Sequence, residues 1–157
     1  MGVSKEEFRN ALGRFASGVT IVTAKGTDGQ PFGITVSAFS SVSLDPPLVL
    51  VCIDKRASLH ECLGEGGHFA VNILSEDQEL TSRRFASKDE DRFNGTDYRE
   101  SAQGTPLIDG SLAALECRVV QAYPGGDHTI VVGEVESASV ADGKPLAYFR
   151  GGYAQLS

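Results

Sequence analysis

The sequence predicts a mainly β protein, an antiparallel barrel with short helices at its edges. About six or seven short segments rich in β-branched residues are separated by turn residues, which is the pattern of antiparallel strands. Only short helical patterns interrupt them, and helices do not alternate with strands as they do in a doubly wound parallel sheet. A length of 157 residues fits one domain, which we expect to span residues 1–157.

The first expected element is a helix that begins after Ser4. Ser4 and Glu7 have the spacing of a capping box, in which each side chain accepts a hydrogen bond from the other residue's backbone N–H. Apolar residues then recur at helical spacing from Phe8 to Phe15, and they predict a face that packs on another part of the protein. Gly18 is expected to end this helix.

Strands are expected to follow this helix. The segments 19–24 and 32–36 flank a glycine-containing turn, and together they predict a hairpin. Further strands are expected at residues 47–53, 69–74, 113–121 and 129–135. Several of these segments are apolar on both faces, as strands buried between a sheet and covering helices would be.

Two short helices are expected between the strands. One begins near Ser58 and ends at the glycine pair 66–67. The other begins at a second capping box, formed by Ser75 and Gln78, and runs toward Phe85. The polar segment 87–104 has mixed charge and no periodicity, so we expect it to be a surface excursion.

Composition limits the partners and the compartment. The formal net charge of −7 disfavours binding to nucleic acid or to an anionic membrane, because both need clustered positive charge. No apolar segment approaches the ~20 residues needed to cross a bilayer. The polar start of the chain does not resemble a secretory signal, so the cytoplasm is the expected location. Three widely spaced cysteines indicate reduced thiols, and the spacing of histidines and cysteines predicts no metal site.

The most unusual segment is residues 33–47, which contains four serines and one threonine within nine residues. One interpretation is a half-exposed edge strand whose small hydroxyls face water. The other is a binding surface, because small side chains let a flat ligand approach the backbone and form hydrogen bonds with its N–H and C=O groups. Two prolines, Pro46 and Pro47, end the segment because they remove backbone donors.

Charged residues suggest a second candidate site. Lys55 and Arg56 precede Ser58 at an expected helix start, which is a workable phosphate site, although an ordinary charged loop has the same composition. Lys88 and Arg92 lie beside the acidic residues 89–91, which neutralise most of their charge, so we expect both side chains to be solvated.

His128 is the third candidate. It follows a glycine turn and precedes an expected strand, which would place it at a sheet edge or barrel mouth, where a surface role is also common. The sequence contains no G-x-S-x-G elbow to present a nucleophilic serine, and no G-x-G-x-x-G or G-x-x-x-x-G-K-[ST] motif for a nucleotide.

Taken in order, these segments resemble the flavin reductase family, the small reductases that partner two-component flavin monooxygenases. The resemblance covers nearly the whole chain and is carried by residues 8–23, 33–47, 70–75, 126–129 and 145–153. It implies an antiparallel split β-barrel that binds FMN or FAD, and a homodimer with the flavin near the subunit interface.

The resemblance further implies an NAD(P)H:flavin oxidoreductase that reduces FMN, or FAD, and supplies the reduced flavin to a partner monooxygenase. Two alternatives stay open: an enzyme of the same fold that keeps its FMN and acts on its own small substrate, and a non-catalytic flavin-binding protein. Hydride transfer between cofactors needs little acid–base machinery, because the cofactors carry the electronics. The chain therefore needs no catalytic triad.

The resemblance also assigns site residues. The flavin ring and ribityl chain are expected at Thr35, Val36, Ser37, Ala38, Ser41, Val42 and Ser43. The flavin phosphate is expected at Arg56, Ala57 and Ser58, and further flavin contacts at Arg84, Phe85 and Ala86. Nicotinamide is expected at His128, Arg150, Gly151, Gly152 and Tyr153. The expected role of His128 is to orient nicotinamide or to manage a proton.

Overall fold

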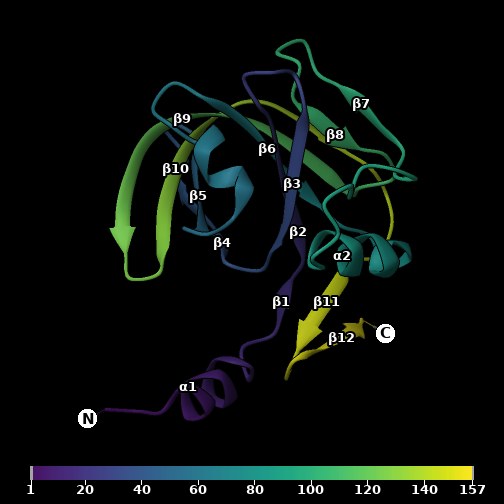
Figure 1. Ribbon diagram of the computed structural model, residues 1–157. Helices are drawn as coiled ribbons and strands as arrows, with labels where there is room; N and C mark the ends of the chain where they lie inside the picture. The colour runs from purple at the N-terminus through teal and green to yellow at the C-terminus, as the bar shows by residue number, and fades with distance from the viewer. Residues whose placement is uncertain (1, 157) are drawn as a thin grey trace.

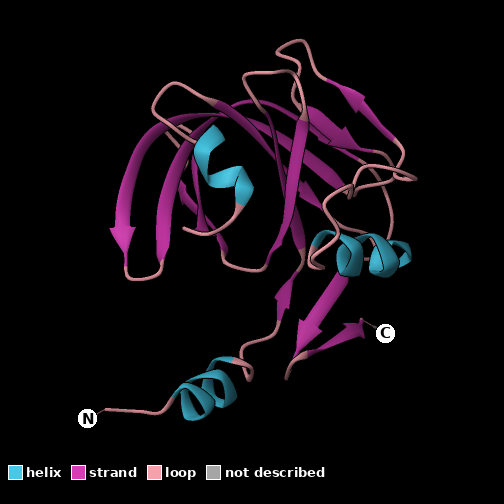
Figure 2. Cartoon of the chain, viewed as in Figure 1, coloured by secondary structure: helices cyan, strands magenta, loops and turns pink. Residues whose placement is uncertain are grey.

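The computed structural model describes residues 2–156, which form antiparallel strands with short helical segments around them (Figure 2). The helical segments are α1 (Lys5–Leu12), the 3₁₀ helices η1 (Ser58–Cys62) and η2 (Glu76–Gln78), and α2 (Glu79–Phe85). The strands are β1 (Ser17–Gly18), β2 (Thr20–Lys25), β3 (Pro31–Val36), β4 (Phe39–Ser43), β5 (Leu48–Asp54), β6 (His68–Ile73), β7 (Tyr98–Glu100), β8 (Pro106–Ile108), β9 (Ala113–Gly125), β10 (His128–Val140), β11 (Leu146–Phe149) and β12 (Gly152–Gln155).

The main sheet has seven strands in the order β3-β2-β6-β9-β10-β5-β4, and each neighbouring pair is antiparallel. Its two edge strands, β3 and β4, are consecutive in the chain, so the sheet curls until its edges approach each other (Figure 1). The edges do not pair with each other, which leaves the barrel split on that side. The expected antiparallel split barrel is therefore confirmed.

Two smaller sheets flank the barrel. One has the order β1-β11-β12, and it lies with α2 below the main sheet in Figure 1. The other is the β7–β8 pair. The barrel interior is apolar, and its largest fully buried side chains include Val22, Val51, Ile53, Phe69, Val71 and Val119. A second apolar cluster joins the barrel to α2 and β11 through Ile21, Leu74, Phe85 and Leu146.

The expected strands are confirmed, and two of them are longer than expected. The expected hairpin is formed by β2 and β3, in which Thr20 pairs with Val36. β9 continues to Gly125 and β10 runs from His128 to Val140, and the hairpin tip around residues 121–127 is exposed. The β9 residues that follow the pairing with β6, and the β10 residues that follow the pairing with β5, pair with the other strand of this hairpin, which extends both strands.

The first helix begins as expected but ends early. Its capping box between Ser4 and Glu7 is present, yet α1 stops at Leu12, and Gly18 lies in β1 where it pairs with β11. The expected end at Gly18 is wrong because the backbone of that segment pairs with a distant strand. The expected packing of the apolar face is also not made within this chain: Phe8, Leu12 and Phe15 are 57%, 55% and 80% exposed.

The two later helices are shorter or differently capped than expected. η1 begins at Ser58 but ends at Cys62, before the glycine pair, and its N-cap residue is Ala57, with no side-chain capping hydrogen bond. The expected capping role of Ser58 is therefore wrong. The second capping box is confirmed: the Ser75 backbone N–H donates to the Gln78 side chain, and η2 leads into α2. No helix within residues 2–156 is long and apolar enough to cross a membrane.

Candidate functional site

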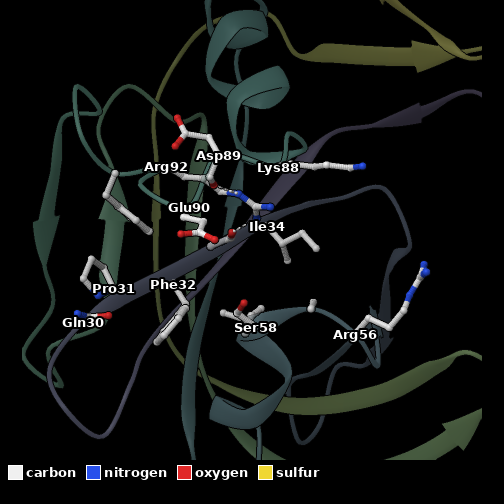
Figure 3. Close-up of a pocket in the computed structure, with 14 residues that line it drawn as sticks. Gln30, Pro31, Phe32, Ile34, Arg56, Ser58, Lys88, Asp89, Glu90 and Arg92 are labelled. Atoms are coloured by element: carbon white, nitrogen blue, oxygen red, sulfur yellow. Dashed lines mark hydrogen bonds between the residues drawn. The ribbon is translucent and has the colours of Figure 1, made fainter.

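A pocket of about 460 Å³ lies at the open side of the barrel (Figure 3). Its walls are the β3 edge, the loop that leads into η1, and the loop after α2. The lining residues are Gln30, Pro31, Phe32, Gly33, Ile34, Arg56, Ala57, Ser58, Leu59, Lys88, Asp89, Glu90, Arg92 and Phe93. Small-molecule and cofactor sites typically enclose about 300–1,000 Å³, so the pocket is large enough for a ligand of that class.

The β3 wall is an edge strand, and this decides the position of the pocket. β2 pairs with one side of β3, while the other side has no neighbouring strand in the main sheet. An unpaired strand edge exposes backbone N–H and C=O groups that can bind another molecule or another segment. In Figure 3, Phe32 and Ile34 extend from this strand, and Ser58 faces them from η1. The pocket therefore combines apolar side chains with polar backbone.

The second wall is a loop that Asp54 organises. The Asp54 carboxylate at the end of β5 accepts hydrogen bonds from the Arg56 backbone N–H at 2.8 Å and from the Arg56 guanidinium at 2.9 and 3.2 Å. These bonds hold the pKa of the Asp54 carboxyl well below its usual range. The guanidinium itself is 87% exposed. Two guanidinium nitrogens are therefore bound to Asp54, while the side chain remains exposed at the pocket.

His128 lies next to this loop. It is the first residue of β10 and pairs with Asp54 of β5 in the sheet register. The His128 Nδ1 atom is 2.8 Å from the Asp127 carboxylate, and the Asp127 carbonyl accepts a hydrogen bond from the Lys55 N–H. His128 does not line the pocket, but the structure brings it close to the loop that carries Arg56 and Ser58.

The third wall is the loop 87–93, and here the expected solvation of the cations is wrong for Arg92. The Arg92 side chain is half-buried, and its guanidinium donates to the Gly33 carbonyl of β3 at 2.8 Å. Lys88 is exposed and lines the pocket. The segment is not a simple surface excursion, because it folds back on β3 and later includes β7.

Arg84 and Phe85, expected to contact flavin, support this loop without lining the pocket. The Arg84 Nε donates to the Arg92 carbonyl at 2.7 Å. Phe85 is fully buried and meets Phe93 edge-on, with ring centroids 4.9 Å apart. Ala86 is the exposed C-cap of α2. Only Arg56, Ala57 and Ser58 of the expected flavin residues line the pocket.

The hydroxyl-rich segment continues from the pocket wall along the open side of the barrel. The Thr35 hydroxyl donates to the Ser82 carbonyl of α2 at 2.6 Å, and Val36 is buried in the core. Its remaining expected flavin residues are exposed or half-buried on β4 and the turn before it: Ser37, Ala38, Ser41, Val42 and Ser43. β4 is thus an edge strand, as one interpretation predicted, and flavin binding there stays a prediction.

The expected nicotinamide residues do not all come together in one chain. Arg150 and Gly151 form the turn between β11 and β12, and Gly152 and Tyr153 lie on β12, in the three-stranded sheet. His128 lies in the main sheet, as the first residue of β10. The Tyr153 hydroxyl is instead 2.7 Å from the Ser82 hydroxyl.

The sequence match decides the family. The chain matches the flavin reductase like domain over residues 12–157. The chain belongs to the flavin reductase family. Membership confirms the resemblance carried by the five segments, and it agrees with the split barrel and its open edge.

Relatives of this flavin reductase have named activities. The FMN reductase (NADH) SmoA of Agrobacterium fabrum is 46% identical over 156 residues, covering 99% of this chain and 88% of SmoA. HsaB of Rhodococcus jostii, the reductase subunit of a flavin-dependent monooxygenase, is 41% identical over 155 residues, covering 98% of this chain and 79% of HsaB. The NADH:FAD oxidoreductase SgcE6 of Streptomyces globisporus, solved with NAD and FAD fragments, has a TM-score of 0.92 and 38% identity, covering 98% of this chain and 93% of that one.

Sequence reasoning missed part of the flavin reductase pocket. Two groups of residues line it but belonged to an expected strand and an expected surface segment: Phe32 and Ile34, and Lys88, Asp89, Glu90, Arg92 and Phe93. One signal could have found the loop: Phe93 is an aromatic residue inside an otherwise polar segment, and the structure half-buries it. Within residues 2–156, no group of three or more histidine, cysteine, aspartate or glutamate side chains could hold a metal ion.

Proposed function

We propose that this flavin reductase transfers a hydride from NADH or NADPH to FMN, with FAD as the second choice, and supplies the reduced flavin to a separate monooxygenase. The observation that carries the proposal is the pocket between the β3 edge, the loop that leads into η1 and the loop after α2, in a chain that belongs to this family. The activities named for SmoA and HsaB support it. One domain spanning residues 1–157 and a cytoplasmic location, where both nucleotides are available, belong to the same proposal.

The pocket residues fit a flavin phosphate and ribityl chain. Arg56 and Lys88 are cations on two different walls, and the Ser58 hydroxyl lies on one of them, so they would hold the phosphate. The exposed backbone around Ser37 and Ser41 would meet the ring, because small side chains leave its N–H and C=O groups accessible. When bound, the flavin supplies the redox chemistry as the hydride acceptor.

The chain's own contribution is orientation. Reacting atoms must be held about 3–3.5 Å apart for transfer, and the rigid strands β3, β4 and β10 carry the residues that would position both ligands. His128 is oriented by the contact of its Nδ1 with Asp127, which directs Nε2 away from that carboxylate. Nε2 would then donate to or accept from the nicotinamide amide.

We further propose that the protein is a homodimer and that a second copy covers the apolar face of α1. Phe8 and Leu12 share one face of α1, Phe15 follows the helix, and all three side chains are exposed in the single chain. Contiguous exposed apolar surface marks an interaction site. A second copy would also supply another Arg150–Tyr153 turn, which in one chain belongs to a different sheet from His128.

An anaerobic titration tests the proposed activity. The purified protein is mixed with FMN and then with NADH or NADPH, and the absorbance band of oxidised flavin is followed. We expect the band to disappear with at least one nucleotide. Persistence of the band with both nucleotides would refute the proposal and favour a non-catalytic flavin-binding protein.

Steady-state kinetics then separate a reductase of free flavin from an enzyme that keeps its flavin. We expect the rate of NADH oxidation to saturate as free FMN is added. A rate that does not depend on added FMN, from protein purified with bound flavin, would favour the enzyme with its own small substrate.

A further inference from the structure

The guanidinium of Arg92 joins two walls of the pocket. It donates to the Gly33 carbonyl on β3 at 2.8 Å, to the Asp89 carbonyl at 3.2 Å and to the Ser87 carbonyl at 2.5 Å. The last two acceptors belong to the loop 87–93 and the first to the strand edge. Figure 3 shows the Arg92 side chain extending from the loop toward β3. One side chain therefore connects the loop to the strand.

These hydrogen bonds engage the Arg92 guanidinium, which would otherwise be free to bind a phosphate. Within residues 2–156, no carboxylate forms an ion pair with Arg92, so its donors are directed at backbone carbonyls. Removal from water lowers the pKa of the Arg92 guanidinium, in agreement with its half-buried position. A planar guanidinium presents five donors in a fixed fork and can serve three carbonyls at once.

The loop is also held by Arg84 and by an aromatic contact. Arg84 donates to the carbonyls of Arg92 and Asp91 at 2.7 and 2.9 Å. Phe93, the residue after Arg92, packs edge-on against the buried Phe85. The hydrogen bond from Arg92 to the Gly33 carbonyl joins the loop directly to the backbone of β3. A side chain thus occupies one backbone carbonyl of the β3 edge, where another strand would otherwise pair.

We infer that Arg92 is a positioning residue: it fixes the loop 87–93 against β3 and so holds Lys88, Asp89 and Glu90 at the pocket, opposite Arg56 and Ser58. This inference rests on the proposed function for the identity of the ligand. Arg92 affects flavin binding through the loop, because its own guanidinium is hydrogen-bonded to backbone carbonyls. Loss of the Arg92 hydrogen bonds should raise the Kd for flavin more than it changes the KM for the nicotinamide nucleotide or kcat at saturating flavin.

The variant Arg92→Lys tests this role, because lysine keeps the charge but lacks the planar fork. The matched control is Arg99→Lys, since Arg99 is exposed on β7 and pairs with Asp109 away from the pocket. Fluorescence titration with FMN should give a Kd raised roughly ten-fold or more for Arg92→Lys, the effect expected from losing hydrogen bonds made by a charged group. Arg99→Lys should bind like the wild type.

Two further measurements exclude a merely structural role. In steady-state kinetics of Arg92→Lys, the KM for FMN should rise while kcat at saturating FMN and the KM for NADH stay within about two-fold of the wild type, because the loop acts on flavin binding. In the flavin-free protein, backbone amides of residues 87–95 should exchange hydrogen faster in Arg92→Lys than in the wild type.

The outcomes separate the two proposals. A wild-type protein that does not bind FMN would refute the proposed function, while the exchange experiment would still test whether Arg92 holds the loop. A folded Arg92→Lys variant with the wild-type Kd for FMN, or with unchanged exchange in residues 87–95, would overturn the inference. Equal increases in the KM for FMN and the KM for NADH would overturn it as well.

Discussion

Ser58 is the residue at which the proposed phosphate position can be tested most directly. The Ser58 side chain lines the pocket and makes no capping hydrogen bond, so a substitution at this position removes no capping bond from η1. Ser58→Asp should weaken FMN binding by about ten-fold or more, since like charges about 4 Å apart repel by roughly 4 kcal/mol near a protein surface before screening. Riboflavin, which has no phosphate, should be affected far less.

The control for Ser58→Asp is Ser139→Asp, which adds the same charge on an exposed part of β10 outside the pocket lining. Titration of both variants with FMN and riboflavin separates a local effect from a change in net charge. Equal losses of affinity for the two flavins would show that the phosphate does not lie at Ser58.

His128 carries the prediction about the nicotinamide. His128→Ala removes a ring nitrogen beside the Arg56 loop while leaving the pocket lining intact. The loss of one or two hydrogen bonds should raise the KM for NADH by about five- to thirty-fold. The Kd for FMN should stay within about two-fold of the wild type, because no pocket residue is changed.

His68→Ala is the matched control, since His68 is also half-buried but lies on β6, beside Glu136. It should leave both parameters unchanged. A folded His128→Ala protein that no longer bound FMN would place His128 in the flavin site.

At the scale of elements, β3 and α2 fit together only because residue 33 is glycine. A Cβ atom at Gly33 would lie 2.7 Å from Cε2 of the Phe85 ring and 3.2 Å from Cζ of Phe93. Phe85 is fully buried, so its ring cannot move aside freely. Gly33→Ala should therefore lower the free energy of unfolding by about 1–3 kcal/mol, the typical cost of overpacking.

Urea denaturation measures this effect, with Gly64→Ala as the control. A Cβ atom at Gly64 would meet nothing within 4 Å, and that residue lies in an exposed loop. If Gly33→Ala had the same free energy of unfolding as Gly64→Ala, the predicted overpacking between β3 and α2 would be refuted.

At the scale of the whole molecule, the exposed face of α1 predicts self-association. Leu12→Asp on α1 and Phe15→Asp just after it each place a charge on this exposed apolar surface, and burying an unpaired charge at an interface is strongly unfavourable. We expect the wild type to sediment as a dimer and both variants to shift toward the monomer at micromolar concentration. Asn10→Asp, on the opposite face of the helix, should remain dimeric.

Analytical ultracentrifugation and light scattering give the mass directly. A monomeric wild type, or a dimer that persists in both variants, would refute the homodimer with α1 at its interface. The fold of each variant can be checked separately, because α1 contributes no buried residue to the core of the chain.

Local sequence patterns predicted the elements well where the physics is local. Both capping boxes depend on residues three positions apart, and β2 is buried on both faces as its β-branched composition indicated. The predicted end of α1 was wrong, because Gly18 pairs with β11, far along the chain. The predicted capping of η1 by Ser58 was wrong, because the backbone turn places Ala57 at the N-cap.

The sequence by itself determined the family, the antiparallel strands and the loop of Arg56 and Ser58, because these depend on motifs and short-range periodicity. Only the tertiary structure decided that the loop 87–93 folds onto the edge of β3, and that the face of α1 is left without a partner within the chain. Both facts arise from contacts between distant residues, such as Arg92 with Gly33. No pattern within either segment encodes which surface the other will meet.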